Sequence, residues 1–145
     1  MKAVIQVVKN AELSVDNKVV SSIGKGYVVF FGVKKGDTTV EADYIVKKIA
    51  SLRIFEDENG KTNLSLKDVG GEVLFVSQFT LYANASHGNR PDFLDAEKPD
   101  QANAIYEYAL KQFDNYGIVA KKGVFGEHMV ISQVNDGPFT LVLEK

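Results

Sequence analysis

The sequence predicts an α+β fold, in which several strands precede, separate and follow two helices. Short runs rich in branched and aromatic residues recur along the chain, and two longer segments have apolar residues at helical spacing. Gly, Asn, Asp or Pro stand between most of these segments. The 145 residues are 45% hydrophobic and 25% charged, which suits one globular domain over residues 1–145.

The first part of the chain is expected to form strands separated by tight turns. Asp16-Asn17-Lys18 has the composition of a hairpin turn. Gly24-Lys25-Gly26 lacks the pattern of a phosphate-binding loop, so a plain turn is favoured there. The strands in this part are predicted at residues 3–8, 13–15, 19–23 and 27–33.

Two helices are predicted from apolar spacing and from signals at their ends. Thr38 and Glu41 have the spacing of a capping box, and Pro99 stands where a first helical turn favours it. Gly117 is expected to stop the second helix. The buried faces should comprise Val40, Ile45, Ile49 and Leu52 in the first helix and Ala102, Ile105, Tyr106, Ala109 and Phe113 in the second.

Between the helices, a turn at Asn59-Gly60 precedes a strand predicted from Glu72 to Leu81. The acids at residues 56–58 lack the alternating ligand spacing of a calcium loop, so a solvated turn is favoured over a metal site. Residues 82–95 mix Asn, Ser, His, Gly, Arg and Pro, which predicts an irregular loop. A loop of this length is often functional, so it is expected to border a site.

Near the end of the chain, Asn135-Asp136-Gly137-Pro138 separates two apolar runs of strand length. These turn residues predict a hairpin-like connection. A Gly-Pro step permits close backbone approach and a cis bond, although the rarity of cis bonds favours trans on this observation alone. A further strand is expected at residues 118–121.

Composition limits the classes of function. The net charge is −2, whereas a protein that holds RNA mainly through phosphates is usually basic, so any RNA contact must be local. The absence of cysteine fits a cytoplasmic protein, and residues 1–6 are expected to start a strand rather than a signal peptide. The candidate basic contacts are Lys34-Lys35, Lys47-Lys48, Lys121-Lys122, Arg53 and Arg90.

The usual catalytic sets are missing from the sequence pattern. His87 and His128 are isolated and lack zinc spacing, so non-catalytic roles are favoured for both. No G-x-S-x-G motif of a serine hydrolase occurs. Thr80 offers a hydroxyl without an adjacent base, which favours an ordinary strand residue over a nucleophile.

Two motifs together carry a resemblance to a known family. Ser77-Gln78-Phe79-Thr80-Leu81 and Asn135-Asp136-Gly137-Pro138-Phe139-Thr140 resemble the signatures of the D-aminoacyl-tRNA deacylases, in order and at the right spacing. The resemblance covers essentially the whole chain. It also includes residues 3–6, 36–38, 52–61, 63–72, 88–91 and 125–126.

The resemblance implies a curved, barrel-like mixed sheet with two main helices packed outside, in a two-fold homodimer. It implies an editing hydrolase that cleaves the ester of D-aminoacyl-tRNA, and of glycyl-tRNA mischarged on alanine tRNA. No cofactor and no metal-ligating residue are predicted, and the sequence does not decide whether a metal ion affects the activity. The 2′-OH of the terminal ribose would assist hydrolysis, while the protein supplies positioning and oxyanion stabilisation.

The family's site residues transfer to matching positions of this chain. Ser77, Gln78, Phe79 and Thr80 would form the catalytic pocket, with the N–H groups of Phe79 and Thr80 stabilising the oxyanion. A cis Gly137-Pro138 step would reach in from the partner subunit and leave no room for an L side chain. The residues implied to bind substrate are Gly137, Pro138, Asn135, Phe125 and Arg90.

Three positions depart from the family pattern. Val7 stands where an arginine usually helps to hold the Gly-Pro loop, so either another residue fixes the loop or the loop is looser. His87 replaces a common lysine, and Phe139 replaces a smaller residue that borders the pocket. The Val7 departure leaves open a non-catalytic tRNA- or nucleotide-binding module, and a purely structural dimer is a third reading.

Overall fold

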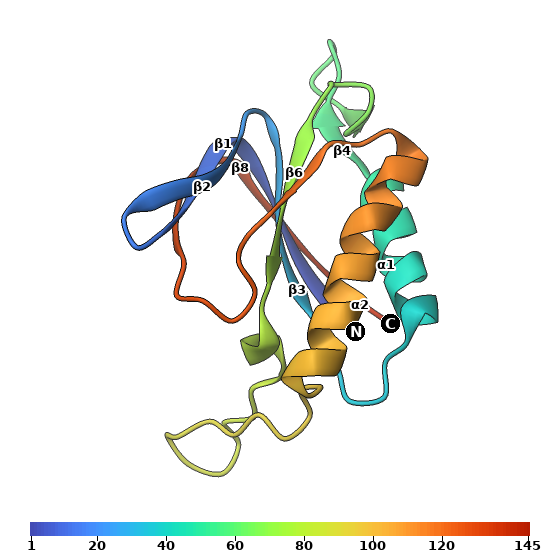
Figure 1. The fold of residues 1–145 in the computed structure, drawn as a ribbon. Coiled ribbons are helices and arrows are strands. Elements are labelled where there is room, and N and C mark those ends of the chain that lie inside the picture. The colour runs from blue at the N-terminus through green and yellow to red at the C-terminus, as the bar shows by residue number, and fades with distance from the viewer.

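The computed structural model describes residues 1–145 as a curved mixed sheet with two helices packed against its outer side (Figure 1). The expected α+β class and barrel-like architecture are confirmed. The helices are α1 (Thr39–Ser51) and α2 (Pro99–Gln112), and the 3₁₀ helices are η1 (Phe79–Tyr82) and η2 (Phe113–Tyr116). The strands are β1 (Lys2–Val15), β2 (Lys18–Ile23), β3 (Gly26–Gly32), β4 (Arg53–Glu56), β5 (Thr62–Ser65), β6 (Glu72–Ser77), β7 (Ala120–Lys122) and β8 (Val130–Glu144).

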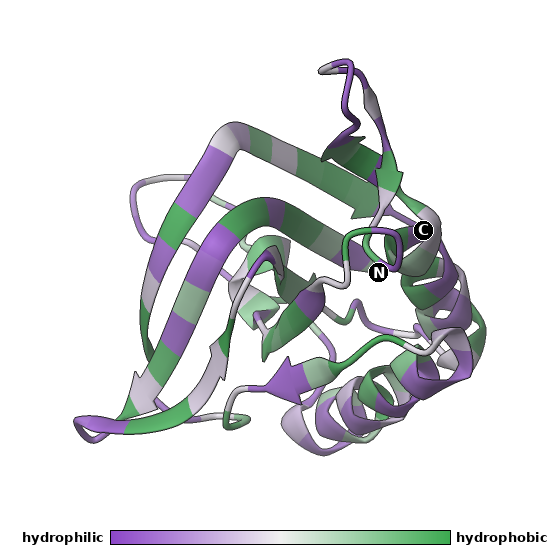
Figure 2. Cartoon of the chain, turned by 90° about the horizontal axis from the view of Figure 1, so that it is seen from above, coloured by the Kyte–Doolittle hydropathy of each residue, from purple (hydrophilic) through white to green (hydrophobic).

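The main sheet is built around the long strand β1. One edge of β1 pairs antiparallel with β2 and β3, and the other edge pairs antiparallel with β8. Strands β6 and β7 continue the sheet in parallel from β3. Hydrogen bonds from the Ser21 hydroxyl to the Lys122 carbonyl (2.6 Å) and from the Lys121 ammonium to the Ser22 carbonyl (2.7 Å) join β2 to β7. The sheet therefore curls almost into a barrel, and both long strands bend midway (Figure 2).

The hairpin-like turn predicted at residues 135–138 is wrong. Strand β8 is continuous, and β1 pairs with it on both sides of this segment. Gln6 lies opposite Thr140 and Val8 lies opposite Asn135, so one residue of β1 faces four residues of β8. Residues 136–139 therefore form a bulge, here called the β8 bulge, because the two apolar runs follow the same partner strand in the same direction.

The turn predicted near the N-terminus is confirmed, although the strand before it is longer than expected. Asp16 and Asn17 have φ values of 50° and 60°, as a two-residue hairpin turn requires. Residues 3–8 and 13–15 belong to the same strand, β1. The turn around Asn59-Gly60 is also present, and Asp57 accepts hydrogen bonds there from the N–H groups of Lys61 and Asn59.

Helix α1 begins as its capping signal predicts. The Thr38 hydroxyl accepts from the Val40 N–H at 3.2 Å, and the Glu41 carboxylate accepts from the Thr38 N–H at 2.8 Å. Ile45 and Ile49 are fully buried, but Val40 is 66% exposed, so its expected place on the apolar face is wrong. Five residues separate Val40 from Ile45, which turns its side chain about 140° away from that face.

The core between the helices and the sheet is centred on Phe75 in β6. The ring centroid of Phe75 lies 4.8 Å from that of Phe31, 5.3 Å from Tyr106 and 5.4 Å from Phe113. The Tyr106 hydroxyl donates to the Phe75 carbonyl at 2.7 Å. The stripe predicted for α2 is buried as expected and comprises Ala102, Ile105, Tyr106, Ala109 and Phe113. A smaller cluster, including Val8, Leu13, Val28 and Leu74, fills the inner side of the sheet.

Strand β6 is shorter than predicted, because it ends at Ser77 and η1 follows. A Cβ atom on Gly32 would lie only 3.1 Å from the Leu81 Cβ atom, so the missing side chain of Gly32 makes room for this turn. Thr80 consequently lies in a 3₁₀ turn and not in a strand.

The segment from Tyr82 to α2 is irregular, as predicted. Its regular pairing is limited to isolated bridges between Asn84 and Asp92 and between Lys34 and Ala96. Pro99 occupies the start of α2, and Gly117 follows η2 with a φ of 66°. No helix combines the length and the apolar character needed to cross a membrane.

Candidate functional site

A pocket of about 630 Å³ opens where β6 ends against the loop that leads into α2. Val76, Ala102 and Ile131 contribute apolar side chains to it. Its remaining lining comes from Val33, residues 77–79, Phe93, residues 96–99 and residues 125–129. The pocket therefore combines the first predicted motif with three segments that are distant from it in sequence.

The motif segment Ser77–Phe79 is held by the most buried part of the sheet. Strand β6 is sandwiched between β3 and β7, and the Gln78 N–H donates to the Phe31 carbonyl at 2.8 Å. Ser77 and Gln78 are half-buried, whereas Phe79 is 55% exposed. The Phe79 ring meets the Phe93 ring edge-on, with centroids 5.0 Å apart. This wall is therefore rigid at its base and apolar at its rim.

Thr80 lies beside the pocket and does not line it. Its hydroxyl accepts a hydrogen bond from the Gln78 side-chain amide at 2.6 Å, and no base contacts it. Its own N–H and that of Phe79 begin η1, where the first amides of a helix have no partner within that helix. The segment thus offers N–H donors at the pocket wall rather than an activated hydroxyl.

The opposite wall, formed by the loop before α2, is tied to the segment after β3. The Glu97 carboxylate accepts from the Gly36 N–H at 2.9 Å and from the Lys98 N–H at 2.7 Å. These two hydrogen bonds, that of Gly36 first, hold the pKa of Glu97 below its usual value. Backbone bonds from Lys35 N–H to the Asp95 carbonyl and from Glu97 N–H to the Val33 carbonyl complete the attachment.

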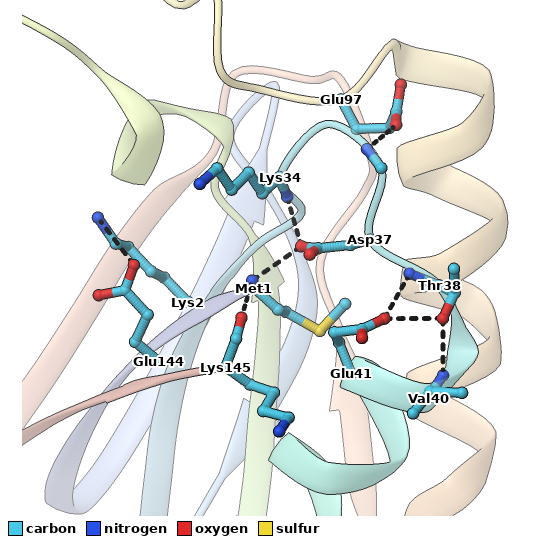
Figure 3. A network of polar contacts seen from close by, with 11 residues as sticks. Met1, Lys2, Lys34, Asp37, Thr38, Val40, Glu41, Glu97, Glu144 and Lys145 are labelled. Atoms are coloured by element: carbon cyan, nitrogen blue, oxygen red, sulfur yellow. Dashed lines mark hydrogen bonds and ion pairs between the residues drawn. The ribbon is translucent and has the colours of Figure 1, made fainter.

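The segment after β3 is itself anchored by the first residue of the chain (Figure 3). The Met1 ammonium is fully buried, lies 2.9 Å from the Asp37 carboxylate and donates to the Lys145 carbonyl at 2.6 Å. The same Asp37 oxygen accepts from the Lys34 N–H at 2.7 Å. This ion pair therefore links β1 and the last residue of the chain to the loop that supports the pocket wall.

The structure brings some of the predicted site residues together and leaves others apart. Phe125 lines the pocket with the motif segment. Arg90 is exposed in the loop and lies outside the pocket lining. Asn135, Gly137 and Pro138 lie on β8, away from the pocket of their own chain, and the Gly137-Pro138 peptide is cis. Phe139 packs against the main core instead of bordering that pocket.

Sequence reasoning missed several pocket residues. Glu97 and Lys98 were not singled out, although the loop before them was expected to border a site. His128 lines the pocket, but no hydrogen bond joins it to Ser77, so the two do not form a nucleophile–base pair. Glu97 and Lys98 reach the pocket through the loop before α2, and His128 reaches it through the connection between β7 and β8. No local sequence pattern predicts the path of either connection. The other residues missed are Phe93, Glu127 and Met129.

The basic pairs differ in whether they are free to bind RNA. Lys121 lies 2.8 Å from the Glu72 carboxylate, and Lys122 lies 2.6 Å from that of Glu107. These two lysines are therefore engaged within the chain. Lys34-Lys35 adjoins the pocket wall through its backbone contacts with Ala96 and Asp95.

Known proteins match this chain along its length. The family model described as D-Tyr-tRNA(Tyr) deacylase matches residues 4–144. A D-aminoacyl-tRNA deacylase of Lactobacillus acidophilus is 49% identical over 144 residues, covering 99% of each chain. A solved structure described as the c-Myc DNA Unwinding Element Binding Protein has a TM-score of 0.93 at 41% identity, covering 100% of this chain and 99% of that one. A structure titled as a probable eukaryotic D-amino acid tRNA deacylase shares the fold, with a TM-score of 0.82 at 18% identity and coverage of 98% and 97%.

Proposed function

Because the chain belongs to the D-Tyr-tRNA(Tyr) deacylase family, we propose that it is an editing hydrolase that removes D-amino acids from tRNA. The observation that carries this proposal is the position of Ser77–Phe79 in the wall of the pocket. The pocket is also lined by the rings of Phe79, Phe93 and Phe125. Aromatic rings stack on unpaired bases, so this rim suits the terminal adenosine of a tRNA.

The reaction is the hydrolysis of an ester. A water oxygen attacks the carbonyl carbon, the bond to the ribose oxygen breaks, and the proton of water passes to that oxygen. The pocket holds no paired nucleophile and base, so we assign assistance to the neighbouring 2′-OH of the substrate. We assign oxyanion stabilisation to the Phe79 N–H in the pocket wall, together with the Thr80 N–H beside it. Ser77 and Gln78 position the adenosine and the ester.

Selection against L substrates is assigned to Gly137 and Pro138 of a partner subunit. In its own chain the β8 bulge does not line the pocket, which supports a role across an interface. The carbonyls of Gly137 and Pro138 face the α-amino group and occupy the space that an L side chain needs. A D side chain points elsewhere, and glycine has none, so glycyl-tRNA mischarged on alanine tRNA is also a substrate.

The open edge and the exposed apolar side chains of β8 support a two-fold dimer. This strand pairs only with β1, so its other edge is open. Three of its valines are well exposed, with Val130 at 57%, Val134 at 49% and Val142 at 65%. Open edges and exposed apolar side chains favour association. In the proposed dimer, each β8 bulge reaches the pocket of the other subunit.

A non-catalytic tRNA-binding module on the same fold is the alternative. The observation that favours it is Val7, which is buried in the core and offers no polar group to the bulge. Turnover separates the two functions, because a binding module retains affinity for uncharged tRNA but cleaves nothing. That affinity would fall steeply with salt.

The direct test compares deacylation of D-Tyr-tRNA and L-Tyr-tRNA at equal enzyme concentration. We expect rapid loss of the D ester and persistence of the L ester. Gly137→Val should abolish or reshape the D activity, because the added side chain enters the substrate space. Cleavage of neither ester by the wild-type protein would refute the hydrolase and favour the binding module. Normal deacylation by Gly137→Val would refute the assignment of the bulge.

A further inference from the structure

Four polar side chains join the two ends of the β8 bulge. The Gln133 side-chain amide donates to the Asn135 side-chain oxygen at 2.6 Å and to the Gln6 side-chain oxygen at 2.7 Å. The Gln6 amide in turn donates to the Thr140 hydroxyl at 3.4 Å. Asn135 and Thr140 are the residues directly before and after the bulge. The chain of bonds among Gln6, Gln133, Asn135 and Thr140, here called the amide clamp, therefore crosses the mouth of the bulge.

The bonding pattern of the clamp fixes how its amides are oriented. Gln133 uses both N–H groups as donors, and Gln6 uses its oxygen as an acceptor and its nitrogen as a donor. Turning either amide over would place two oxygens or two nitrogens against each other. Both glutamines are half-buried on the face of the sheet, where hydrogen bonds are less weakened by water.

Few other polar contacts hold the bulge. Lys9 lies 3.9 Å from the Asp136 carboxylate, but both side chains are well exposed, at 64% and 43%. Ion pairs of this kind contribute little. Val7, the one residue of β1 opposite the bulge, has no polar side-chain atom. The half-buried Phe139 ring packs against the core and holds one end of the bulge. The amide clamp is thus the main polar tether across its mouth.

We propose that Gln6 and Gln133 are positioning residues for chiral selection, and that the amide clamp sets how strictly L substrates are rejected. The inference rests on the proposed function, in which the β8 bulge fills the space of an L side chain. Exclusion by shape depends on holding the excluding atoms within a fraction of an ångström. D-ester cleavage depends mainly on the pocket, to which the clamp does not belong.

Releasing the clamp should therefore act on the two substrates unequally. When its hydrogen bonds are lost, the bulge gains freedom to withdraw, and the L ester is admitted more often. Each hydrogen bond in such a network contributes about a fivefold factor to the equilibrium between the held and the withdrawn bulge. We expect L cleavage to rise about fivefold or more relative to D cleavage in the strongest variant.

The strongest variant is Gln133→Met, which keeps the length of the side chain but removes both donors. Thr140→Val and Thr140→Ser form a matched pair, because valine keeps the shape without the hydroxyl and serine keeps the hydroxyl. Lys9→Met is the control, since it removes the exposed ion pair to the same bulge. Single-turnover rates with D-Tyr-tRNA and L-Tyr-tRNA give the ratio of D to L cleavage for each dimeric protein.

The expected result is a lower D to L ratio for Gln133→Met and Thr140→Val, with the wild-type ratio kept by Thr140→Ser and Lys9→Met. A wild-type ratio in Gln133→Met and Thr140→Val would overturn the proposal. So would an equal change in both rates, because the clamp would then serve folding or catalysis rather than selection. Failure of the wild-type protein to cleave the D ester would refute the proposed function instead, so the two failures are distinguishable.

Discussion

The pocket segment Ser77–Phe79 and the β8 bulge are built in opposite ways. The pocket segment leaves a strand whose residues Val73 to Val76 are at most 1% exposed, and Phe75 at its centre contacts three other rings. The bulge interrupts an edge strand and carries the largely exposed Gly137 and Pro138. The pocket therefore takes its geometry from the core, whereas the bulge depends on a few side-chain contacts.

This difference separates two kinds of mutational effect. Changes beneath the pocket should cost stability first and activity as a consequence. Changes at the bulge should alter which substrate is accepted while leaving most of the folding free energy in place. Four predictions, given from the largest expected effect to the smallest, test this difference.

The largest expected effect is that of Phe75→Ala. Removing a fully buried ring from the centre of the core should lower the free energy of unfolding by about 3–5 kcal/mol, measured by urea denaturation. The matched control is Phe79→Ala in the pocket rim, where the ring is 55% exposed and the cost should stay below about 1 kcal/mol. Equal costs for the two rings would contradict the division between core and rim.

The next effect is expected at the loop that supports the pocket wall. Asp37→Ala leaves the buried Met1 ammonium without its carboxylate and should lower the free energy of unfolding by about 3 kcal/mol. Asp37→Asn keeps an acceptor for the Lys34 N–H, so it should recover part of this loss. Thermal denaturation of both variants and of the wild type checks the expected order of stability, in which Asp37→Asn lies between the wild type and Asp37→Ala. Unchanged stability in Asp37→Ala would show that the ion pair does not stabilise the fold.

A smaller loss of stability is expected for Gly137→Ala in the bulge. Gly137 has a φ of +125°, and an added Cβ would lie 2.8 Å from the Phe139 nitrogen. The strain should cost about 1–3 kcal/mol, while D-Tyr-tRNA cleavage falls more than this loss of folded protein explains. Gly60→Ala is the control, because φ there is also positive (+69°), no atom lies within 4 Å of the added Cβ, and Gly60 does not line the pocket. Parallel losses of activity and stability at Gly137 would argue against a direct role.

The smallest effect concerns acidification. Hydrogen bonds from the Gly36 and Lys98 N–H groups lower the folded-state pKa of Glu97, so its contribution to stability is full above the ordinary pKa of about 4.3 and is lost as the pH falls through the lowered value. The wild-type protein should lose stability across this window more steeply than Glu97→Gln. Urea denaturation at several pH values gives the slopes, and identical slopes would contradict the assignment.

Local signals in the sequence predicted the parts of the fold that are decided locally. The Thr38–Glu41 capping box, the start of α2 at Pro99 and the turn at Asp16-Asn17 depend on neighbouring residues, and all are present. The predicted turn at residues 135–138 failed because a bulge and a hairpin use the same residue types. Only the pairing of β8 with β1, over more than 100 residues of chain, distinguishes the two.

The sequence predicted the part of the candidate site that lies in or near one continuous motif. Ser77, Gln78, Phe79 and Phe125, which the family resemblance assigns to the site, line one cavity, and their roles stay predictions. Glu97 and His128 reach it through chain paths that no short pattern reports, and Thr80 lies outside it because η1 replaces the end of the expected strand. The amide clamp could not be predicted from the sequence either, because it joins residues from the two ends of the chain.

The central claim is that the pocket of one subunit and the β8 bulge of the other form a single site. Mixed dimers, made by co-refolding equal amounts of two variants, test it most directly. Ser77→Trp blocks the pocket, and Gly137→Val disrupts the bulge. In a two-fold dimer, half of the random pairs are mixed, and each mixed pair keeps one intact site. We predict that D-specific activity returns to about one quarter of the wild-type value. Mixed dimers that form, as seen by mass, but stay inactive would contradict the account.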